Sequence, residues 1–443
     1  MSSKPAGVGM VPNSWSVEEL RAFLSLITYG FTNPMPDASE GPWKLTAKDV
    51  VDGRINYGTA RRTTIEAFEK LLTDKSRPKI GDVLLTKDGS IGRVAVADRP
   101  GICINQSVAL LRPNERITPP FLKYLLMAPY YQAVMEGDSD GSTIKHIYIT
   151  RVDKMQVAIP PLDEQNRIVE LVGRVDDRIT LLRETNATLE AIAQALFKSW
   201  FVDFDPVRAK MEGRAPEGMI DATAALFPDG FEESELGLVP RGWRVCPIGD
   251  VVESVGGGTP NTKESSFWEP GEYCWTTPKD LSGVQAPVLL TTERKLSAKG
   301  LSKVSSGLLP AGTLLMSSRA PIGYLAIAQT PLAINQGYIA MLPSSRLPPL
   351  YMLFWCRHNM ENIKGRANGS TFMEISKKAF RPIPALVPSE PILAAFVDVA
   401  EPLFTRLVEN EKQAETLAAL RDTLLPRLIS GQLRLPEAEA LIA

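Results

Sequence analysis

Short polar sequences that could bind a ligand occur twice in this chain, in the same order. Lysine side chains carry positive charge and donate hydrogen bonds, and serine, threonine and glutamine side chains both donate and accept them. The recurring residues are Lys48 and Lys279, Gln106 and Gln336, Ser142-Thr143 and Ser370-Thr371, and the turn Lys87-Asp88-Gly89-Ser90 with its counterpart Ser317-Ser318-Arg319. The offset between the copies drifts from 231 to 228 residues. Side chains of these types can bind a ligand through charge and hydrogen bonds.

The spacings that mark common catalytic and cofactor sites are missing from the sequence. The two histidines, His146 and His358, lie far apart, and the four cysteines form no Cys-x-x-Cys pair, so neither a zinc site nor a disulfide frame is predicted. Gly256-Gly257-Gly258 lacks the spacing of a dinucleotide loop. Asn33-Pro34-Met35-Pro36 departs at its last two positions from the Asn-Pro-Pro-aromatic motif of amino-methyltransferases. We therefore predict a non-catalytic protein that holds no cofactor or metal itself.

The elements that must position these residues also occur twice. A period this long indicates a duplicated domain, not a solenoid of 20- to 50-residue repeats. Each copy mixes short β-rich runs, turns and a few helical patches, such as the patch from Phe121 to Met135, which predicts an α+β fold. We expect a first repeat domain over 1–160, a spacer helix over 161–200, a linking or docking segment over 201–240, a second repeat domain over 241–388 and a second spacer helix over 389–435.

The two spacer segments have the spacing of long helices. From Asp163 to Lys198 the sequence has no proline, and apolar residues alternate in steps of three and four, which predicts a coiled-coil seam. The second segment repeats the pattern, with Pro402 near its start and Pro426 near its end. Antiparallel packing of the two helices would bury both seams and produce a pseudo-twofold dumbbell. Asn186 and Asn410 interrupt the seams, either to fix the register or because the positions are half-exposed.

Charge is distributed unevenly along the chain. The formal net charge is -2, yet residues 1–160 carry +3 and residues 241–388 carry +7, while the helical and linking segments are acidic. A positive field confined to the two domains would attract phosphate groups. No apolar run is long enough for a membrane helix, and the first residues lack a signal-peptide pattern, so a cytoplasmic location is expected.

Several stretches resemble the specificity subunits of type I restriction-modification systems. The strongest likeness is the central run from Leu196 through Trp200-Phe201-Val202-Asp203-Phe204-Asp205-Pro206 to Gly213, which follows Pro160-Pro161-Leu162-Asp163-Glu164-Gln165. Tyr29 to Pro34, Gly237 to Trp243 and Leu424 to Gly431 support it. The opening of the first repeat, Trp15 to Leu20, departs from that of the second.

The resemblance implies a DNA-recognition subunit with no catalytic role of its own. Each of two target-recognition domains would read one half of a split, asymmetric sequence in double-stranded DNA, and the helices would set the gap. Two methyltransferase subunits would dock on this subunit and bind S-adenosylmethionine, and motor-nuclease subunits would complete the complex. We expect Trp200, Phe201, Phe204 and Asp205 to form the docking surface, with a packed corner of the fold as the alternative.

The recurring polar residues are the candidates for DNA contact. Those shared by both copies, such as Lys48 and Lys279, suit phosphate contacts, because the two domains would read different bases. Lys87, Lys145 and Arg319 differ between the copies and suit base reading. The other candidates are Asp88, Gly89, Ser90, Gln106, Ser142, Thr143, Ser317, Ser318, Gln336, Ser370 and Thr371. The alternative for each is a role in maintaining the fold.

Three other functions remain open. A scaffold that does not bind DNA, or a decoy of the methyltransferase subunits, would keep the paired helices without needing two basic domains. A self-contained methyltransferase would need a cofactor motif that the sequence lacks.

Overall fold

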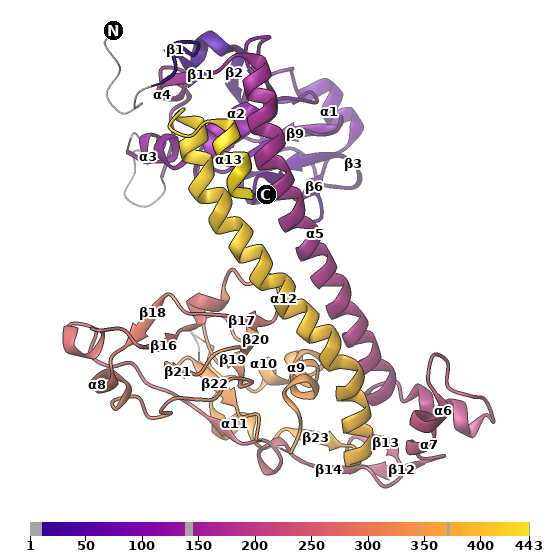
Figure 1. The fold of residues 1–443 in the computed structure, drawn as a ribbon. Helices are drawn as coiled ribbons and strands as arrows, with labels where there is room; N and C mark the ends of the chain where they lie inside the picture. The colour runs from indigo at the N-terminus through magenta and orange to yellow at the C-terminus, as the bar shows by residue number, and fades with distance from the viewer. Residues whose placement is uncertain (1–10, 138–144, 345, 370–372, 443) are drawn as a thin grey trace. The chain divides into compact units, whose positions relative to one another are not determined.

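The computed structural model describes residues 11–137, 145–344, 346–369 and 373–442, which divide into two compact units. The first unit contains the residues up to 178 together with those from 416 onward, and the second contains residues 179–415. Each unit consists of a mixed domain and a part of each of two long helices (Figure 1). The predicted α+β class is confirmed.

In the first unit, a four-stranded antiparallel sheet has the order β2-β10-β7-β8. All four residues of β7 are buried, because both faces of the sheet are covered. Val83 and Leu85 pack with the helices, while Leu84 packs toward a second sheet of order β6-β3-β9. The strands of the two sheets are β2 (Leu24–Tyr29), β3 (Ala38–Leu45), β6 (Arg61–Arg62), β7 (Val83–Thr86), β8 (Val94–Val96), β9 (Ile102–Ile104) and β10 (Val108–Pro113).

Smaller elements complete the first domain. They are β1 (Ser16–Glu19) paired with β11 (Gln156–Ile159), β4 (Val50–Val51) paired with β5 (Arg54–Ile55), the 3-10 helices η1 (Leu20–Phe23) and η2 (Ala47–Asp49), and the helices α1 (Ile65–Leu71), α2 (Pro119–Met127), α3 (Pro129–Gly137) and α4 (Ile149–Val152). The patch expected from Phe121 to Met135 is therefore two helices. Pro129 disfavours helical geometry at Ala128, which has ψ 138° and ends α2.

The domain of the second unit has the same plan. Its larger sheet has the order β15-β22-β19-β20-β17 and its smaller sheet the order β18-β16-β21. The strands are β14 (Arg244–Pro247), β15 (Ser254–Val255), β16 (Tyr273–Thr276), β17 (Val288–Leu289), β18 (Arg294–Leu296), β19 (Leu314–Ser317), β20 (Leu325–Ala328), β21 (Leu332–Ile334), β22 (Tyr338–Met341) and β23 (Pro384–Val387), with β14 paired to β23. The helices are η3 (Ile248–Asp250), η4 (Ser265–Phe267), η5 (Pro278–Leu281), α8 (Ala298–Leu301), α9 (Pro349–His358), α10 (Met360–Gly365) and α11 (Lys377–Phe380).

The two domains share most of their strands, since the order β2-β10-β7-β8 corresponds to β15-β22-β19-β20, while β17 extends only the second sheet. In each small sheet a central strand pairs in parallel with one neighbour and antiparallel with the other. Two glycines show how close the match is. A Cβ atom added at Gly30 would lie 1.8 Å from the backbone oxygen of Ile104, and one added at Gly257 would lie 1.8 Å from that of Ile334. Both positions therefore require glycine for the same close backbone approach.

The two long helices are α5 (Leu162–Phe201) and α12 (Glu390–Ile429), each of 40 residues. In the second unit they run antiparallel, since Asn186 contacts Asn410 and, farther along α5, Phe201 contacts Phe396. In the first unit, Asp176 of α5 forms an ion pair of 2.9 Å with Arg421 of α12. The helix α12 continues through Pro402 and Pro426, so neither proline ends it. A turn at Gly431, with φ 71°, leads to α13 (Leu435–Ile442).

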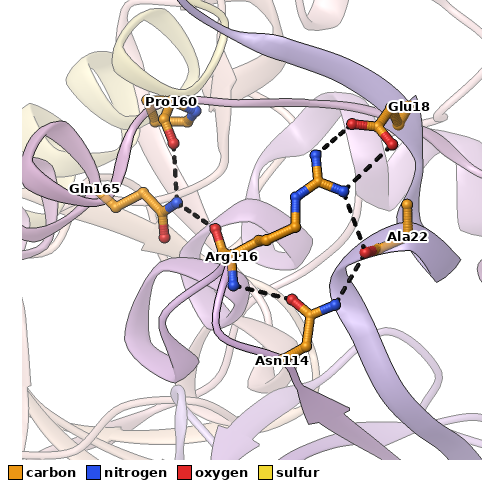
Figure 2. Close-up of polar contacts among 6 residues, drawn as sticks. All are labelled: Glu18, Ala22, Asn114, Arg116, Pro160 and Gln165. Carbon is orange, nitrogen blue, oxygen red and sulfur yellow. Dashed lines mark hydrogen bonds and ion pairs between the residues drawn. The ribbon is translucent and has the colours of Figure 1, made fainter.

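The start of α5 is fixed to the first domain by a buried side chain (Figure 2). Gln165 donates hydrogen bonds from Nε2 to the backbone oxygens of Arg116 and Pro160, both at 2.9 Å, and accepts one from Thr118 N at 2.9 Å. The Arg116 side chain extends the network to Glu18 and lowers the pKa of that carboxyl by hydrogen bonding. All of these contacts lie within the first unit, so the helix leaves its domain in a defined direction.

Candidate nucleic-acid interface

Lys48 and Lys279 occupy equivalent positions on two short helices with the same cap. Thr46 and Asp49 form a capping box around η2, and Thr277 and Asp280 form one around η5. The carboxylate of Asp49 accepts hydrogen bonds from Thr46 N at 2.8 Å and from Thr46 Oγ1 at 2.9 Å. The cap fixes the backbone and leaves both lysine side chains exposed, although Lys279 also forms a 3.2 Å ion pair with Glu293. Two matched cations are thus displayed on rigid turns.

Gln106 and Gln336 each follow an asparagine, Asn105 or Asn335, and the two residues of each pair have different environments. Asn105 Oδ1 accepts a hydrogen bond from Ser107 N at 3.1 Å, and Asn335 Oδ1 accepts one from Gly337 N at 2.8 Å, so both asparagines hold their own turns. Gln106 and Gln336 are exposed at the tips. The Oε1 atom of Gln336 accepts a 2.7 Å hydrogen bond from Thr259 Oγ1. Gln106 and Gln336 remain candidates for contact with a ligand.

Three of the candidates for DNA contact, at the turn after β7 and at the end of β19, are buried rather than exposed. They are Lys87, Ser317 and Ser318. Ser317 is fully buried, and its Oγ donates to Pro321 O at 2.7 Å and accepts from Tyr324 N at 2.8 Å. Ser318 is 2% exposed. Lys87 is 7% exposed, and its Nζ forms a 2.9 Å ion pair with Asp88. The prediction that these three side chains reach DNA is corrected, because their burial and their internal contacts make them structural.

A cleft of about 1200 Å³ in the first domain gathers several of the predicted residues. Lys48 lines it from η2, and Asp88, Gly89 and Ser90 line it from the turn after β7. Polar and charged residues that the sequence did not single out complete much of the wall, namely Asp37, Lys44, Asp49, Asn56, Thr59, Arg61, Asn105 and Ser107. The cleft therefore unites residues that lie seventy positions apart in the chain, such as Asp37 and Ser107, and it presents both hydrogen-bond donors and acceptors.

Two further contacts, which sequence reasoning missed, involve His146 and Glu374. His146 Nδ1 is hydrogen-bonded to Asp88, and Glu374 forms a 3.7 Å ion pair with Arg319. The repeat offset was the signal that could have found them, because His146 and Glu374 are 228 residues apart. Lys145, next to His146, is exposed and forms a 3.2 Å ion pair with Glu136. Ser142, Thr143, Ser370 and Thr371 lie outside the described residues.

The segment expected to dock partners is mostly inside the fold. Trp200 and Phe201 are each 5% exposed and belong to an aromatic cluster at the end of α5 that includes Phe227, Trp243 and Phe396. The prediction that Trp200 and Phe201 form a docking surface is therefore corrected, because the packed corner that the sequence left open describes them better.

Phe204 is half-buried between the rings of Phe231 and Trp243, and Asp205 is exposed. The segment continues with α6 (Asp205–Met211), α7 (Asp221–Leu226) and the hairpin of β12 (Phe231–Ser234) and β13 (Gly237–Pro240).

In the described part of the chain, no helix is long and apolar enough to cross a membrane, and no group of three or more His, Cys, Asp or Glu side chains is placed to hold a metal ion.

Comparison with known proteins gives the same organisation. The model of the type I restriction modification DNA specificity domain matches residues 37–191 and 240–416. The MjaIX specificity subunit of a type I restriction enzyme from Methanocaldococcus jannaschii is 26% identical over 451 residues, covering 98% of this chain and 97% of the relative. The HindI specificity subunit from Haemophilus influenzae is 28% identical over 409 residues, covering 81% and 88%.

The fold has a counterpart among solved structures. The crystal structure of the S subunit of a type I restriction-modification system from M. genitalium superposes with a TM-score of 0.53 at 17% identity, covering 95% of this chain and 98% of the other. At that identity the likeness concerns the fold alone, and it agrees with the duplicated domains and the two long helices described above. With two domain matches that span more than half of its length, the chain belongs to the family of type I restriction-modification DNA specificity proteins.

Proposed function

We propose that this chain is the sequence-recognising subunit of a type I restriction-modification complex. Each of its two domains reads one half of a bipartite site in double-stranded DNA. The single observation that carries the proposal is the duplication of a whole domain, with four larger-sheet strands in the same order and the same capped, exposed lysine in both copies. Family membership favours this function over a scaffold that does not bind DNA or a decoy.

The charges and exposed groups support a division of labour within each domain. Lys48 and Lys279 project from rigid turns in the two basic parts of the chain, where they can contact phosphates whatever the base sequence. Gln106 and Gln336 lie at exposed tips, and a glutamine amide can form paired hydrogen bonds with adenine. The domains therefore combine positioning contacts with groups that discriminate bases.

The chemistry of modification and cleavage belongs to partners in this proposal. Two methyltransferase subunits bind the chain and hold S-adenosylmethionine, and motor-nuclease subunits join them to make the restriction complex. The chain itself is not an enzyme. Because Trp200 and Phe201 are buried, we now place methyltransferase docking on the exposed faces of the paired helices, whose sequence is acidic and suits a protein partner better than DNA.

Methylation mapping in a host that carries the complete system tests the recognition role. We expect modified sites with two short specified segments separated by a gap of unspecified bases, and we expect modification to vanish when this chain is deleted. Modification that persists without the chain would contradict the proposal. Mass measurement of the co-expressed complex tests the partners, since it should show one copy of this chain with two methyltransferase subunits.

A further inference from the structure

A pair of complementary polar side chains occupies the same bridge in both domains, with the chemical roles exchanged. In the first domain Asp88 faces His146 across an isolated antiparallel bridge, and in the second Arg319 faces Glu374 across an equivalent bridge. Asp88 and Arg319 are 231 residues apart, and His146 and Glu374 are 228 apart, which are the offsets of the motifs around them. The acid therefore lies on the turn in one copy and on the facing segment in the other.

The backbone around the two bridges is the same. Ile147 N donates to Lys87 O at 2.8 Å, and its counterpart Ile375 N donates to Ser318 O at 3.0 Å. Ile147 and Ile375 are buried at 2% and 1% exposure. Because successive side chains of an extended segment point to opposite sides, His146 and Glu374 point away from the core. The backbone of the two bridges is therefore the same, while the side chains that project from it differ.

The turn that carries Asp88 or Arg319 is also held rigidly. Thr86 Oγ1 donates to Ser90 O at 2.5 Å and accepts from Arg93 N at 2.9 Å. The buried Ser317 makes the same two contacts in the second domain. A residue on such a turn gives up little further freedom when it binds a ligand, which favours precise recognition.

All four side chains are accessible. The exposed fractions of the side chains are 25% for Asp88, 33% for His146, 36% for Arg319 and 46% for Glu374. Asp88 also lines the cleft that contains the exposed Lys48. The pair is therefore neither part of the core nor remote from the groups to which we assign phosphate contact.

We propose that this bridge is a specificity-determining position in each domain, where a carboxylate orients a nitrogen-bearing side chain toward a base edge. The inference rests on the proposed DNA-recognition function. In the second domain Glu374 contacts Nη1 of Arg319, which leaves N–H groups on the other nitrogens of the guanidinium to donate to O6 and N7 of a guanine. In the first domain Asp88 holds Nδ1 of His146, which leaves the single ring nitrogen Nε2 to contact a base.

Different groups at the same position fit an asymmetric site. Arg319 offers a fork of donors that matches guanine, whereas His146 offers one hydrogen bond. The second domain should thus discriminate strongly at one base pair, and the first domain should discriminate less at the equivalent base pair. Glu374 and Asp88 are positioning residues, since each acts through the side chain that it orients.

The test uses the complex with its methyltransferase subunits and a panel of duplexes that carry every single substitution in both half-sites. Arg319→Lys keeps the positive charge but loses the fork. It should lower discrimination about 5- to 150-fold at one base pair of a single half-site, where a guanine is read. Glu374→Gln should give a smaller loss at the same base pair, and His146→Gln should affect one base pair of the other half-site. Unchanged discrimination at the other base pairs of the affected half-site shows in each case that the varied domain is folded.

A matched control and an exchanged pair complete the design. Glu361→Gln breaks a surface ion pair of 3.5 Å with Lys364 in the same domain and should change discrimination at no position. Arg319→Glu combined with Glu374→Arg keeps an ion pair but moves the fork, and it should lose discrimination at the base pair that Arg319→Lys affects. Full discrimination in this exchanged variant would overturn the inference, because it would show that the pair only maintains the fold.

Other results also have defined meanings. If Arg319→Lys leaves discrimination intact, or weakens binding equally on every duplex of the panel, Arg319 does not read a base and the inference is overturned. If the wild-type complex itself binds every duplex equally, the proposed DNA-recognition function fails, and the inference fails with it. The wild-type data alone separate that outcome from the others.

Discussion

The buried amides of Asn186 and Asn410 allow a quantitative test of how α5 and α12 are held together in the second unit. The two residues are 3% and 0% exposed. Asn410 Nδ2 donates to Asn186 Oδ1 at 2.9 Å, and Asn186 Nδ2 donates to Leu407 O at 3.2 Å and to Glu411 Oε2 at 3.2 Å. Asn410 Oδ1 is buried with no hydrogen-bond partner among the described residues. The pair is thus well placed but incompletely satisfied.

Replacing one asparagine should cost more than replacing both. Asn186→Leu leaves the amide of Asn410 without a partner, and Asn410→Leu leaves Asn186 Oδ1 without a donor. Each orphaned buried group costs about 1–3 kcal/mol. The double variant removes both buried amides, including the unpaired Asn410 Oδ1, and adds apolar contact, so it should be at least as stable as the wild type. The coupling free energy in a double-mutant cycle, which is the double effect minus the sum of the two single costs, should therefore be about 2–6 kcal/mol in favour of like pairs.

Calorimetry measures this coupling through the melting temperature. The unit that contains both residues extends from 179 to 415, and for a unit of this size about 1 kcal/mol shifts the melting temperature by roughly 2–4 °C. We expect the double variant to melt about 4–24 °C above the temperature that the sum of the two single effects would give. Additive shifts, with no coupling, would refute the view that the two amides stabilise each other across the helix pair.

Three further predictions address DNA binding, spacing and burial. Lys48→Ala should weaken binding of the complex to all duplex sequences alike, and it should lower by about one the slope of log binding constant against log salt concentration. The control Lys70→Ala, at an exposed α1 lysine paired with Glu66, should change neither quantity. A changed recognition sequence would contradict the phosphate assignment. Four residues added to α5 between Arg183 and Ala187 lengthen a helix by roughly 6 Å and nearly preserve its apolar seam. Methylation mapping should therefore show unchanged half-sites and a gap longer by about one or two base pairs. A changed half-site with the original gap would argue against a spacer role. Burial raises the pKa of the Cys103 thiol to about 12, and it also raises the pKa of the buried Cys356 thiol and of the half-buried Cys246 thiol. Because a reagent reaches half-buried thiols more easily, alkylation at about pH 8 should label Cys246 and Cys274 before the two buried cysteines. Early labelling of Cys103 would contradict the described core.

Much of the fold follows from local sequence patterns. The heptad spacing of the first spacer predicted a helix from Asp163 to Lys198, and α5 extends from Leu162 to Phe201, because apolar periodicity without proline specifies a helix directly. The duplication was visible because paired motifs share turn chemistry, as in the two capping boxes. The Pro129 break was missed, although a proline inside a helical pattern is a signal that could have found it.

The site was harder to predict because burial depends on distant residues. Trp200 and Phe201 look like exposed anchors in the sequence, yet Trp243 and Phe396, far away in the chain, enclose them. Lys87 is a residue type that often contacts a ligand, but its ammonium group forms an ion pair with Asp88 and lies over the ring of Tyr29. His146 and Glu374 belong to no sequence motif. They can be identified as candidate site residues only in the folded chain, where β-bridges place them opposite Asp88 and Arg319.

Exchange of one domain tests the central claim most directly. Residues 241–388 would be replaced by the corresponding segment of a family member with a different recognition sequence, and the methylated sites of the resulting complex would be mapped. The account predicts that one half of the bipartite site changes to that of the donor, while the other half and the length of the gap stay the same. A change in both halves, or in neither, would contradict the claim that each domain reads its own half of the site.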